Sequence, residues 1–488
     1  MESKGRITST LVPIAQKILF GKLSDEDIDN ELLYSTQVDR AHIIMLVKQG
    51  IIKRDSAIKL LLEIQKLRNC GFKTLKDKTS YRGVYLLYEN YLIEKLGMDD
   101  GGVIHTARSR NDLKVTTLLL RLRKPYISLI KELLKLQVVL INKARKHADT
   151  VMPAYTHYQA AVPITFGHYL LAISSSLERG ISALINISGE LGCSPLGAGA
   201  VGGTSFPIDN RATACLLGFE TVSLNSINAV ASRDFALRIL AEISIIGGIL
   251  SRLSEDLLLW ASSEFGYIKL PDNMVGSSSM MPNKRNPFIV EQIQGKCVSA
   301  LGAFVNASTA IHGTPMTNSI PVGTTAMEFI WKPFTDIIHS IILMRLIISK
   351  CSTESTAMER RVNEGYTLAT ELADLLVTGE NIPFREAHSI VGTIVRDACD
   401  KKADLKSAAA EYFQNQKINS GILEDLETHM VVKRTEYGGG PGKTSFDTCL
   451  KACLDKLKEQ NQWRCRQLDK WKIADEKLNA EEEQLLRQ

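Results

Sequence analysis

The chain has 488 residues, of which 44% are hydrophobic, and it carries a formal net charge of +5. This length allows roughly three domains, and the hydrophobic share is enough for a large core. The small charge is spread along the chain, so it does not indicate a nucleic-acid-binding protein, although a positive potential would help to attract a substrate with several carboxylates.

The nine cysteines include no C-x-x-C pair and no His/Cys spacing typical of a zinc site. We therefore expect neither a disulfide framework nor a metal site, no cofactor, and a reducing location, the cytoplasm. Residues 1–10 lack the apolar segment of a signal peptide. The most apolar run, residues 236–260, is interrupted by charged side chains, so it is expected to be a buried helix, and no membrane partner is predicted.

In chain order, residues 1–112 show short helical patterns at 41–50 and 56–68, which predict a mostly helical N-terminal domain. From 113 to 360 the apolar-periodic stretches become long, at 115–140 with an expected kink at Pro125, and then at 164–187, 235–262, 288–311 and 327–348. A helix of about 25 residues spans roughly 37 Å, so the sequence predicts an all-α fold with a central bundle of long helices.

After residue 360 the patterns shorten, which predicts a small helical domain over residues 361–455. Residues 456–488 are highly charged and are expected to form a solvated helix supported by charge pairs four residues apart. Long bundle helices present broad apolar faces that a single chain does not cover easily, so the pattern favours an oligomer.

The first candidate for chemistry is the segment HTARSRND at residues 105–112, directly before an apolar-periodic run. Asn111 or Asp112 is the expected N-cap of that helix. Ser109, Arg110 and Asn111 would then lie at a helix N-terminus, where backbone N–H groups and a guanidinium can bind a carboxylate. An ordinary capped surface helix explains the same pattern equally well.

The second candidate is YTHYQ at residues 155–159, which lies between two prolines and ahead of an apolar stretch. A lone histidine is more often structural than catalytic. Here Thr156 and Gln159 place hydrogen-bonding groups on both sides of His157, and this favours a catalytic role for the histidine.

The third candidate is GSSSMMPNKRNP at residues 276–287, a polar, glycine- and proline-containing loop in an otherwise strongly helical chain. A serine is a poor base unless its alkoxide is stabilised, which the Lys284 ammonium and backbone N–H groups can do. The same cation can hold the charge that develops on a carboxylate when the adjacent C–H proton is removed. A mobile loop can also close over the substrate and exclude water. The segment therefore predicts an elimination beside a carboxylate rather than a hydrolysis.

Together these segments resemble the fumarase/aspartase superfamily and, within it, the argininosuccinate lyases. Four further segments are similar in the same order, and the resemblance extends from about residue 30 to about residue 445; the segments are 195–204, 225–235, 249–267 and 369–392. The resemblance implies a three-domain helical chain and a carbon–nitrogen lyase of amino-acid biosynthesis, which releases fumarate from an N-substituted aspartate by β-elimination. Argininosuccinate, giving arginine and fumarate, is the default substrate. It also implies a homotetramer whose active sites combine segments from different subunits.

By position, the resemblance makes Ser278 the catalytic base, and it assigns Lys284 and Asn286 to the substrate carboxylate. His157 would pair with Glu291, and this pair would either position a water or act as the acid. The other substrate-binding positions that the resemblance implies are Ser109, Arg110, Asn111, Thr156, Gln159, Arg233, Asp39 and Asn318.

The chain departs from the family pattern mostly on the side that binds the amine. Within residues 314–326 the family has a tyrosine, a glutamine and a lysine where this chain has Asn318, Gly323 and Ala326. Elsewhere a family glycine, serine, histidine and aspartate are replaced by Ser277, Asp39, Tyr85 and Phe288. One alternative is therefore the same elimination on a different N-succinyl amine or amino acid of secondary metabolism. A second alternative is a catalytically silent structural relative, which the presence of the catalytic residues disfavours.

Overall fold

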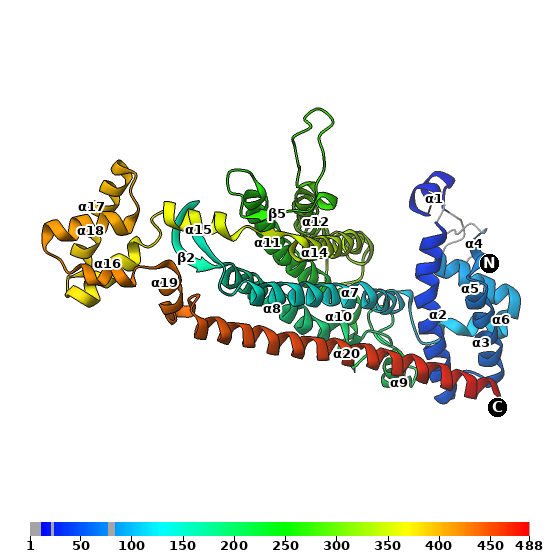
Figure 1. Ribbon diagram of the computed structural model, residues 1–488. Helices are drawn as coiled ribbons and strands as arrows, with labels where there is room; N and C mark the ends of the chain where they lie inside the picture. Colours follow the sequence, from blue (N-terminus) through cyan, green and yellow to red (C-terminus); the bar gives the residue numbers. More distant parts are fainter. Residues whose placement is uncertain (1–10, 21–23, 77–82, 488) are drawn as a thin grey trace.

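The computed structural model describes residues 11–20, 24–76 and 83–487, and it consists almost entirely of helices (Figure 1). This architecture confirms the predicted all-α class. In the described part of the chain, strands occur only as short pairs: β1 (Val151–Thr156) with β2 (Gln159–Thr165), β3 (Cys193–Ser194) with β4 (Thr221–Val222), and β5 (Ile268–Lys269) with β6 (Ser352–Thr353). Residues 1–10, where no signal peptide is expected, and residue 488 lie outside the described residues.

The N-terminal part of the molecule is built from short and medium helices: α1 (Pro13–Phe20), α2 (Asp25–Lys48), α3 (Arg54–Asn69), α4 (Lys73–Lys76), α5 (Val84–Leu96), α6 (Met98–Gly101) and the 3-10 turn η1 (Gly102–His105). Ser24 caps α2, because its hydroxyl accepts the Asp27 N–H at 3.1 Å and the Asp27 carboxylate accepts the Ser24 N–H in return. This cap explains why α2 begins well before the predicted pattern at 41–50.

The centre of the molecule is a bundle of long helices that pack on one another: α7 (Arg110–Lys146), α8 (Phe166–Leu191), α11 (Asp234–Ala261), α12 (Phe288–Ile311) and α14 (Trp331–Lys350). The limits of α12 are the predicted ones. α7 continues through Pro125 as one helix of 37 residues, which is roughly 55 Å long. Its core face repeats every three or four residues, through Leu129, Leu133, Leu136 and Leu140, all fully buried.

Shorter elements connect the bundle helices: α9 (Asn210–Leu216), α10 (Ser226–Ala231), η2 (Asp272–Met274), η3 (Pro321–Thr325) and α13 (Ala326–Glu328). Among the described helices, α8 is the one that is long and apolar enough to cross a membrane by length and composition. It packs against α7, α11 and α20, as the core helix of a bundle does. The apolar run 236–260 forms most of α11, whose buried face includes Ile239 and Leu250.

A small helical unit follows the bundle and has a hydrophobic core of its own, formed by residues such as Leu376, Ile394 and Phe413. Its elements are α16 (Ala369–Glu380), α17 (Phe384–Lys401), α18 (Leu405–Gln416) and η4 (Ser420–Asp425). The elements α15 (Ser355–Glu364), α19 (Thr428–Arg434) and η5 (Tyr437–Gly439) join it to the rest of the chain. In Figure 1 this unit lies at the opposite end of the molecule from the N-terminal helices.

The last helix, α20 (Lys443–Arg487), runs from the small unit back along the bundle to the N-terminal helices (Figure 1). Its 45 residues span roughly 67 Å, and they cross the expected boundary at residue 456 without a break. The helix packs on α7, α8 and α2, so it differs from the solvated helix that its charges predict. The side chains that it buries lie mostly seven residues apart: Phe446, Cys453, Gln460, Gln467, Ala474, Leu478 and Glu482.

Polar contacts hold α20 along its length. The Gln460 side-chain amide donates to the Glu178 carbonyl at 3.1 Å and to the Ser182 hydroxyl at 3.0 Å. Near the far end, the Glu482 carboxylate forms an almost fully buried ion pair with Arg40 on α2. α20 therefore ties the N-terminal helices to the bundle.

The contact of α20 with the bundle predicts unequal effects for two leucines on this helix. Leu478 is 1% exposed, whereas Leu468 is 39% exposed. Leu478→Ala is expected to lower the free energy of unfolding by about 2–5 kcal/mol because it leaves a cavity, and Leu468→Ala by about 0.5 kcal/mol or less. Urea denaturation of the full-length variants measures both. Equal, small effects would mean that α20 is a solvated helix after all.

Candidate active site

The N-terminus of α7 is closed by a capping box. The Ser109 hydroxyl accepts the Asn111 N–H at 3.2 Å, and the Asp112 carboxylate accepts the Ser109 N–H at 3.0 Å. The N-cap is thus Ser109 and not Asn111 or Asp112, because the extended backbone of Ser109 comes before the first helical residue, Arg110. Arg110 and Asn111 remain in the first turn, where the helix end attracts anions.

Asp112 also binds a glycine-rich segment from elsewhere in the chain. Its second carboxylate oxygen accepts the N–H of Gly197 at 3.1 Å and that of Gly199 at 3.0 Å. Gly199 has φ +61°, and a Cβ there would lie 2.6 Å from the carbonyl oxygen of Gly203, so a larger residue does not fit. Sequence reasoning missed this role of Asp112, although the glycines of residues 195–204 were a signal for it.

A buried ion pair lies behind the cap. Asp39 on α2 and Arg108 have fully buried side chains and form a salt bridge, and Arg108 also donates to the Tyr85 hydroxyl. One turn further along α2, His42 Nε2 lies 2.8 Å from the Thr106 carbonyl oxygen. Asp39 is therefore not in a position to contact substrate, in contrast to the expectation from the aligned family serine. It holds the segment that leads into α7 instead.

Burial dominates the protonation of this cluster. Desolvation raises the pKa of Asp39, although the Arg108 guanidinium opposes the shift. Desolvation lowers the pKa of His42 to about 3, and the nearby Arg108 charge acts in the same direction. His42 is consequently neutral at ordinary pH, with its Nε2–H donating to Thr106.

Two of the expected site residues lie beside the cap. The Asn318 amide donates to Asn111 Oδ1 at 2.9 Å, and Asn111 in turn donates to the Ala200 carbonyl at 3.2 Å. A Cβ on Gly323 would lie 2.7 Å from Asn318 Oδ1, so the glycine leaves room for this asparagine. Arg233 caps α11 and is 3% exposed, and burial lowers its pKa to about 10.

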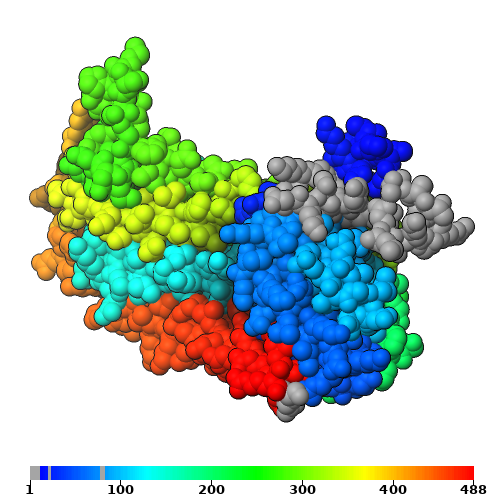
Figure 2. Space-filling view, turned by 90° about the vertical axis from the view of Figure 1, so that its right-hand side faces the viewer, coloured from blue at the N-terminus to red at the C-terminus, as the bar shows by residue number. Residues whose placement is uncertain are grey.

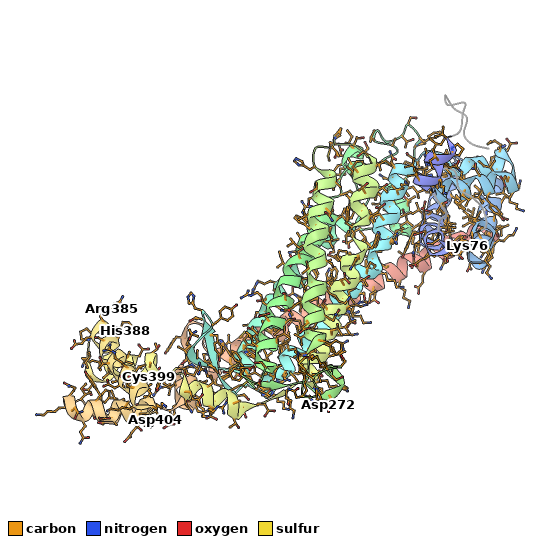
Figure 3. The ribbon with its side chains drawn as sticks, turned by 90° about the horizontal axis from the view of Figure 1, so that it is seen from above. Lys76, Asp272, Arg385, His388, Cys399 and Asp404 are labelled. Carbon is orange, nitrogen blue, oxygen red and sulfur yellow. The ribbon has the colours of Figure 1, made fainter. Side chains whose placement is uncertain are left out.

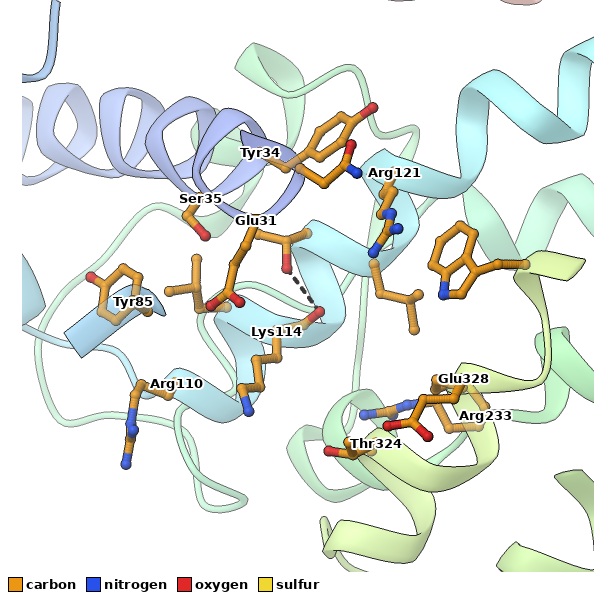
Figure 4. Close-up of a pocket in the computed structure, with 17 residues that line it drawn as sticks. Glu31, Tyr34, Ser35, Tyr85, Arg110, Lys114, Arg121, Arg233, Thr324 and Glu328 are labelled. Carbon is orange, nitrogen blue, oxygen red and sulfur yellow. Dashed lines mark hydrogen bonds between the residues drawn. The ribbon is translucent and has the colours of Figure 1, made fainter. Parts of the chain in front are cut away.

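These elements enclose a cavity of about 260 Å³ between α2, α7 and the segment that leads into α14 (Figure 4). Both Arg110 and Arg233 line it, so arginines from two different helices border one space. Arg233 also donates to the carbonyls of Val230 and Ser232 at 3.0 and 2.6 Å. The lining also includes two acidic side chains, Glu31 and Glu328.

The structure therefore brings Arg110, Asn111, Arg233 and Asn318 close together, and we call these four residues the clamp. The sequence pattern itself predicts a carboxylate site only from Ser109, Arg110 and Asn111.

The second candidate segment forms the tip of the β1–β2 hairpin. Thr156 pairs with Gln159, and the two residues between them have positive φ angles of 52° for His157 and 59° for Tyr158. Such a turn favours glycine or asparagine, so two bulky side chains there indicate a functional constraint. Thr156, His157 and Gln159 are all exposed at this tip.

The serine loop (residues 276–287) stands out from the body of the molecule, as the green projection in Figure 2 shows. Gly276 and Asn286 close it with a pair of backbone hydrogen bonds of 2.8 Å. The Ser278 hydroxyl accepts the N–H of Met280 at 3.3 Å and that of Met281 at 3.0 Å. Outside the loop, Glu291 lies exposed in the first turn of α12.

The three candidate segments lie apart within one chain. α7, roughly 55 Å long, separates the capped segment from the hairpin, and α11, roughly 42 Å long, separates Arg233 from the serine loop. Figure 3 shows Asp272, at the base of the serine loop, well away from Lys76 in the N-terminal helices. Among the described residues no hydrogen bond or ion pair joins His157 to Glu291, or Ser278 to the clamp.

Comparisons with known proteins agree with this architecture. A family model described as lyase matches residues 76–302, and one described as argininosuccinate lyase C-terminal matches residues 366–433. The argininosuccinate lyase of Methanocaldococcus jannaschii is 34% identical over 86% of this chain and 87% of its own length. That of Methanococcus aeolicus is 34% identical over 93% of both chains. A solved structure of an EDDS lyase variant with bound fumarate has a TM-score of 0.87 at 27% identity and covers 99% of this chain and 97% of its own.

The buried His42 predicts a loss of stability in acid. Because its folded pKa of about 3 lies below the unfolded value of about 6.5, the unfolded state binds the extra proton between these values. Stability therefore falls as the pH decreases through this window, by up to roughly 1.4 kcal/mol per pH unit from this group. Urea denaturation at a series of pH values measures the slope.

His42→Gln keeps an N–H donor for Thr106 but does not titrate, so its stability is expected to depend less on pH below about 6.5. The control is His312→Gln, which changes an exposed histidine and should leave the slope as in the unmodified protein. If all three proteins had the same slope, His42 would not be the buried neutral group described above.

Proposed function

Since this chain belongs to the argininosuccinate lyase family and is a carbon–nitrogen lyase that releases fumarate, we propose that its substrate is argininosuccinate, which it cleaves to arginine and fumarate. The geometric observation that carries the proposal is the cavity at the capped end of α7, which both Arg110 and Arg233 line. A pair of guanidinium groups suits the two carboxylates of a succinyl group. With an enzyme family established, the alternative of a catalytically silent relative is not needed.

In the proposed reaction Ser278, as the alkoxide, removes the proton from the carbon next to a substrate carboxylate. The N–H groups of Met280 and Met281 already point at this oxygen, so they can stabilise its negative charge. Lys284 and Asn286 bind the carboxylate, on which the electron pair of the broken C–H bond is held as an aci-carboxylate. That pair then forms the double bond of fumarate while the C–N bond breaks.

The leaving nitrogen takes the electron pair of the C–N bond and needs a proton. His157, oriented by Glu291, supplies it, while Thr156 and Gln159 hold the substrate beside the hairpin tip. Ser109 contributes through the helix end that it caps, and Asn111 binds a substrate oxygen through the amide N–H that Ala200 leaves free.

The assembly that performs this reaction is a homotetramer in the cytoplasm, with each active site shared between subunits. The separation of the three segments within one chain supports this proposal, because a single chain cannot bring Ser278 to Arg110. A second observation supports it as well. α12 carries an exposed apolar stripe at Val298, Leu301 and Val305, which are 69%, 58% and 52% exposed and lie on one helix face.

A second candidate substrate is another N-succinyl amine. It is favoured by residues 314–326, where Asn318, Gly323 and Ala326 replace the family's tyrosine, glutamine and lysine. The deciding experiment follows the ultraviolet absorbance of fumarate after the purified protein is mixed with argininosuccinate. Rapid growth of the signal supports argininosuccinate. A flat trace rejects it, and the reverse reaction of fumarate with a panel of amines then identifies the leaving group.

The mechanism predicts that Ser278→Ala lowers kcat by about 10²–10⁴-fold, with KM little changed, because proton removal is lost while binding contacts remain. Steady-state fumarate release measures both constants. Ser277→Gly, which restores the family residue one position earlier in the same loop, should keep most of the activity. Retained turnover in Ser278→Ala would remove this serine from the role of base.

The shared site predicts recovery of activity from two inactive variants. Ser278→Ala and Arg110→Ala, each inactive alone, are unfolded and refolded together so that their subunits mix. Some mixed sites then contain an intact serine loop from one chain and an intact clamp from another. Fumarate release should reappear in the mixture but not in either variant refolded alone. Continued inactivity in tetramers shown to contain both chains would contradict the shared site.

A further inference from the structure

One face of α7 carries a row of polar side chains along the cavity: Arg110, Lys114, Thr117 and Arg121. Their spacing of four, three and four residues places them on the same side of the helix. The row extends for roughly 16 Å from the capped end of α7. Figure 4 shows Arg110 at one end of this row and Arg121 at the other, with Lys114 between them.

Glu31 faces this row from α2 (Figure 4). Burial raises the pKa of its carboxyl group, against the opposing charge of Lys114, a hydrogen bond from the Tyr85 backbone and the charge of Arg121. Among the described residues no cationic side chain lies within ion-pair distance of this carboxylate. Glu31 is thus a half-buried acid in the wall of a cavity, and among these residues it has no salt-bridge partner of its own, so a cationic ligand group can supply one.

The far end of the row is in contact with an aromatic side chain. The Arg121 guanidinium lies over the Trp331 ring, 3.9 Å from its centroid. Lys114 is exposed and can move toward the cavity. Glu31, Lys114 and Arg121 therefore border one part of this cavity, and one acid with two cations matches the ammonium and the carboxylate of an α-amino acid. The second acid of the lining, Glu328, lies on the opposite wall, in the segment that leads into α14.

We propose that this cavity binds the amino-acid end of the leaving amine, with Glu31 binding the ammonium group and Arg121 and Lys114 binding the carboxylate. The inference rests on the proposed function, in which Arg110 at the near end of the row holds the succinyl half. The length of the row allows the two ends of a long substrate to be bound along one helix face.

The amine would then be recognised by α2 and α7 rather than by residues 314–326. Gly323 borders the same cavity, and its missing side chain leaves the room that Asn318 occupies beside Arg233. Residues on α2 and α7, on the opposite wall of the cavity, would thereby replace the amine-binding side chains that the family has in residues 314–326. Glu31 is a specificity-determining residue for an amine that is itself an amino acid.

The test measures fumarate release from argininosuccinate by full-length Glu31→Gln. The variant keeps the shape of the side chain but loses its charge, so KM is expected to rise about ten- to a hundredfold while kcat changes little. The control is Glu26→Gln, which removes one charge from an exposed position on the same helix and should leave KM unchanged. Thermal denaturation checks that both variants are folded.

A KM for Glu31→Gln equal to that of Glu26→Gln would overturn the proposal, as would a loss of kcat at constant KM. If the unmodified protein releases no fumarate from argininosuccinate, the proposed substrate fails but the cavity is still tested in the reverse reaction. Fumarate is then offered with other amino acids that carry a second amine, ornithine and lysine, and with the decarboxylated and the deaminated analogue of each. A preference for amines with a complete amino-acid end that Glu31→Gln abolishes supports the proposal, and equal use of all amines overturns it.

Discussion

The carboxylate of Asp112 is the point on which the candidate clamp depends. It accepts N–H groups from Ser109, Gly197 and Gly199, and so fixes the end of α7 to a segment far away in the sequence. A charged acceptor with several backbone donors is among the stronger polar contacts in a protein interior. It also leaves the positive end of the helix facing the cavity, where Arg110 adds its own charge. The orientation of the clamp is thus set by three backbone N–H groups that share one side-chain acceptor, so replacing Asp112 alone would remove all three hydrogen bonds.

The long helices stabilise this fold, but they also hold the parts of the candidate site far apart. A helix such as α7 buries a continuous stripe of leucines and is therefore rigid over its whole length. The same rigidity keeps the ends of the helix apart, so groups attached to opposite ends cannot meet by bending. Chemistry that needs both ends requires a neighbouring chain, and the exposed stripe on α12 is the kind of surface through which chains associate.

The structure of an element can be predicted from the sequence when its limits and its buried face have a recognisable residue pattern. α12 has the predicted limits because Pro287 and a regular apolar pattern mark them. The packing of α20 escaped prediction because its buried row contains Gln460 and Gln467, which carry no hydrophobic signal. For Asp39 the reason is different. Its alignment with a substrate-binding serine of the family suggests a place in the site, but a carboxylate at this position needs a cationic partner. Arg108 provides that partner in the protein interior, so Asp39 does not face the substrate. Local residue patterns thus predict the helices well. They do not predict which residues from distant parts of the chain pair with one another in the folded protein.

The spacing of the buried residues in α20 restricts how this part of the gene can evolve. Positions 446, 453, 460, 467 and 474 keep one face against the bundle because seven residues complete almost two turns. Inserting a single codon would rotate every later side chain by about 100° and turn Leu478 and Glu482 away from their contacts. Deletions and insertions in multiples of seven codons preserve that face, although they shift it along the bundle. Point substitutions between these positions are tolerated more easily, so the composition of the tail is less restricted than the spacing of its buried residues.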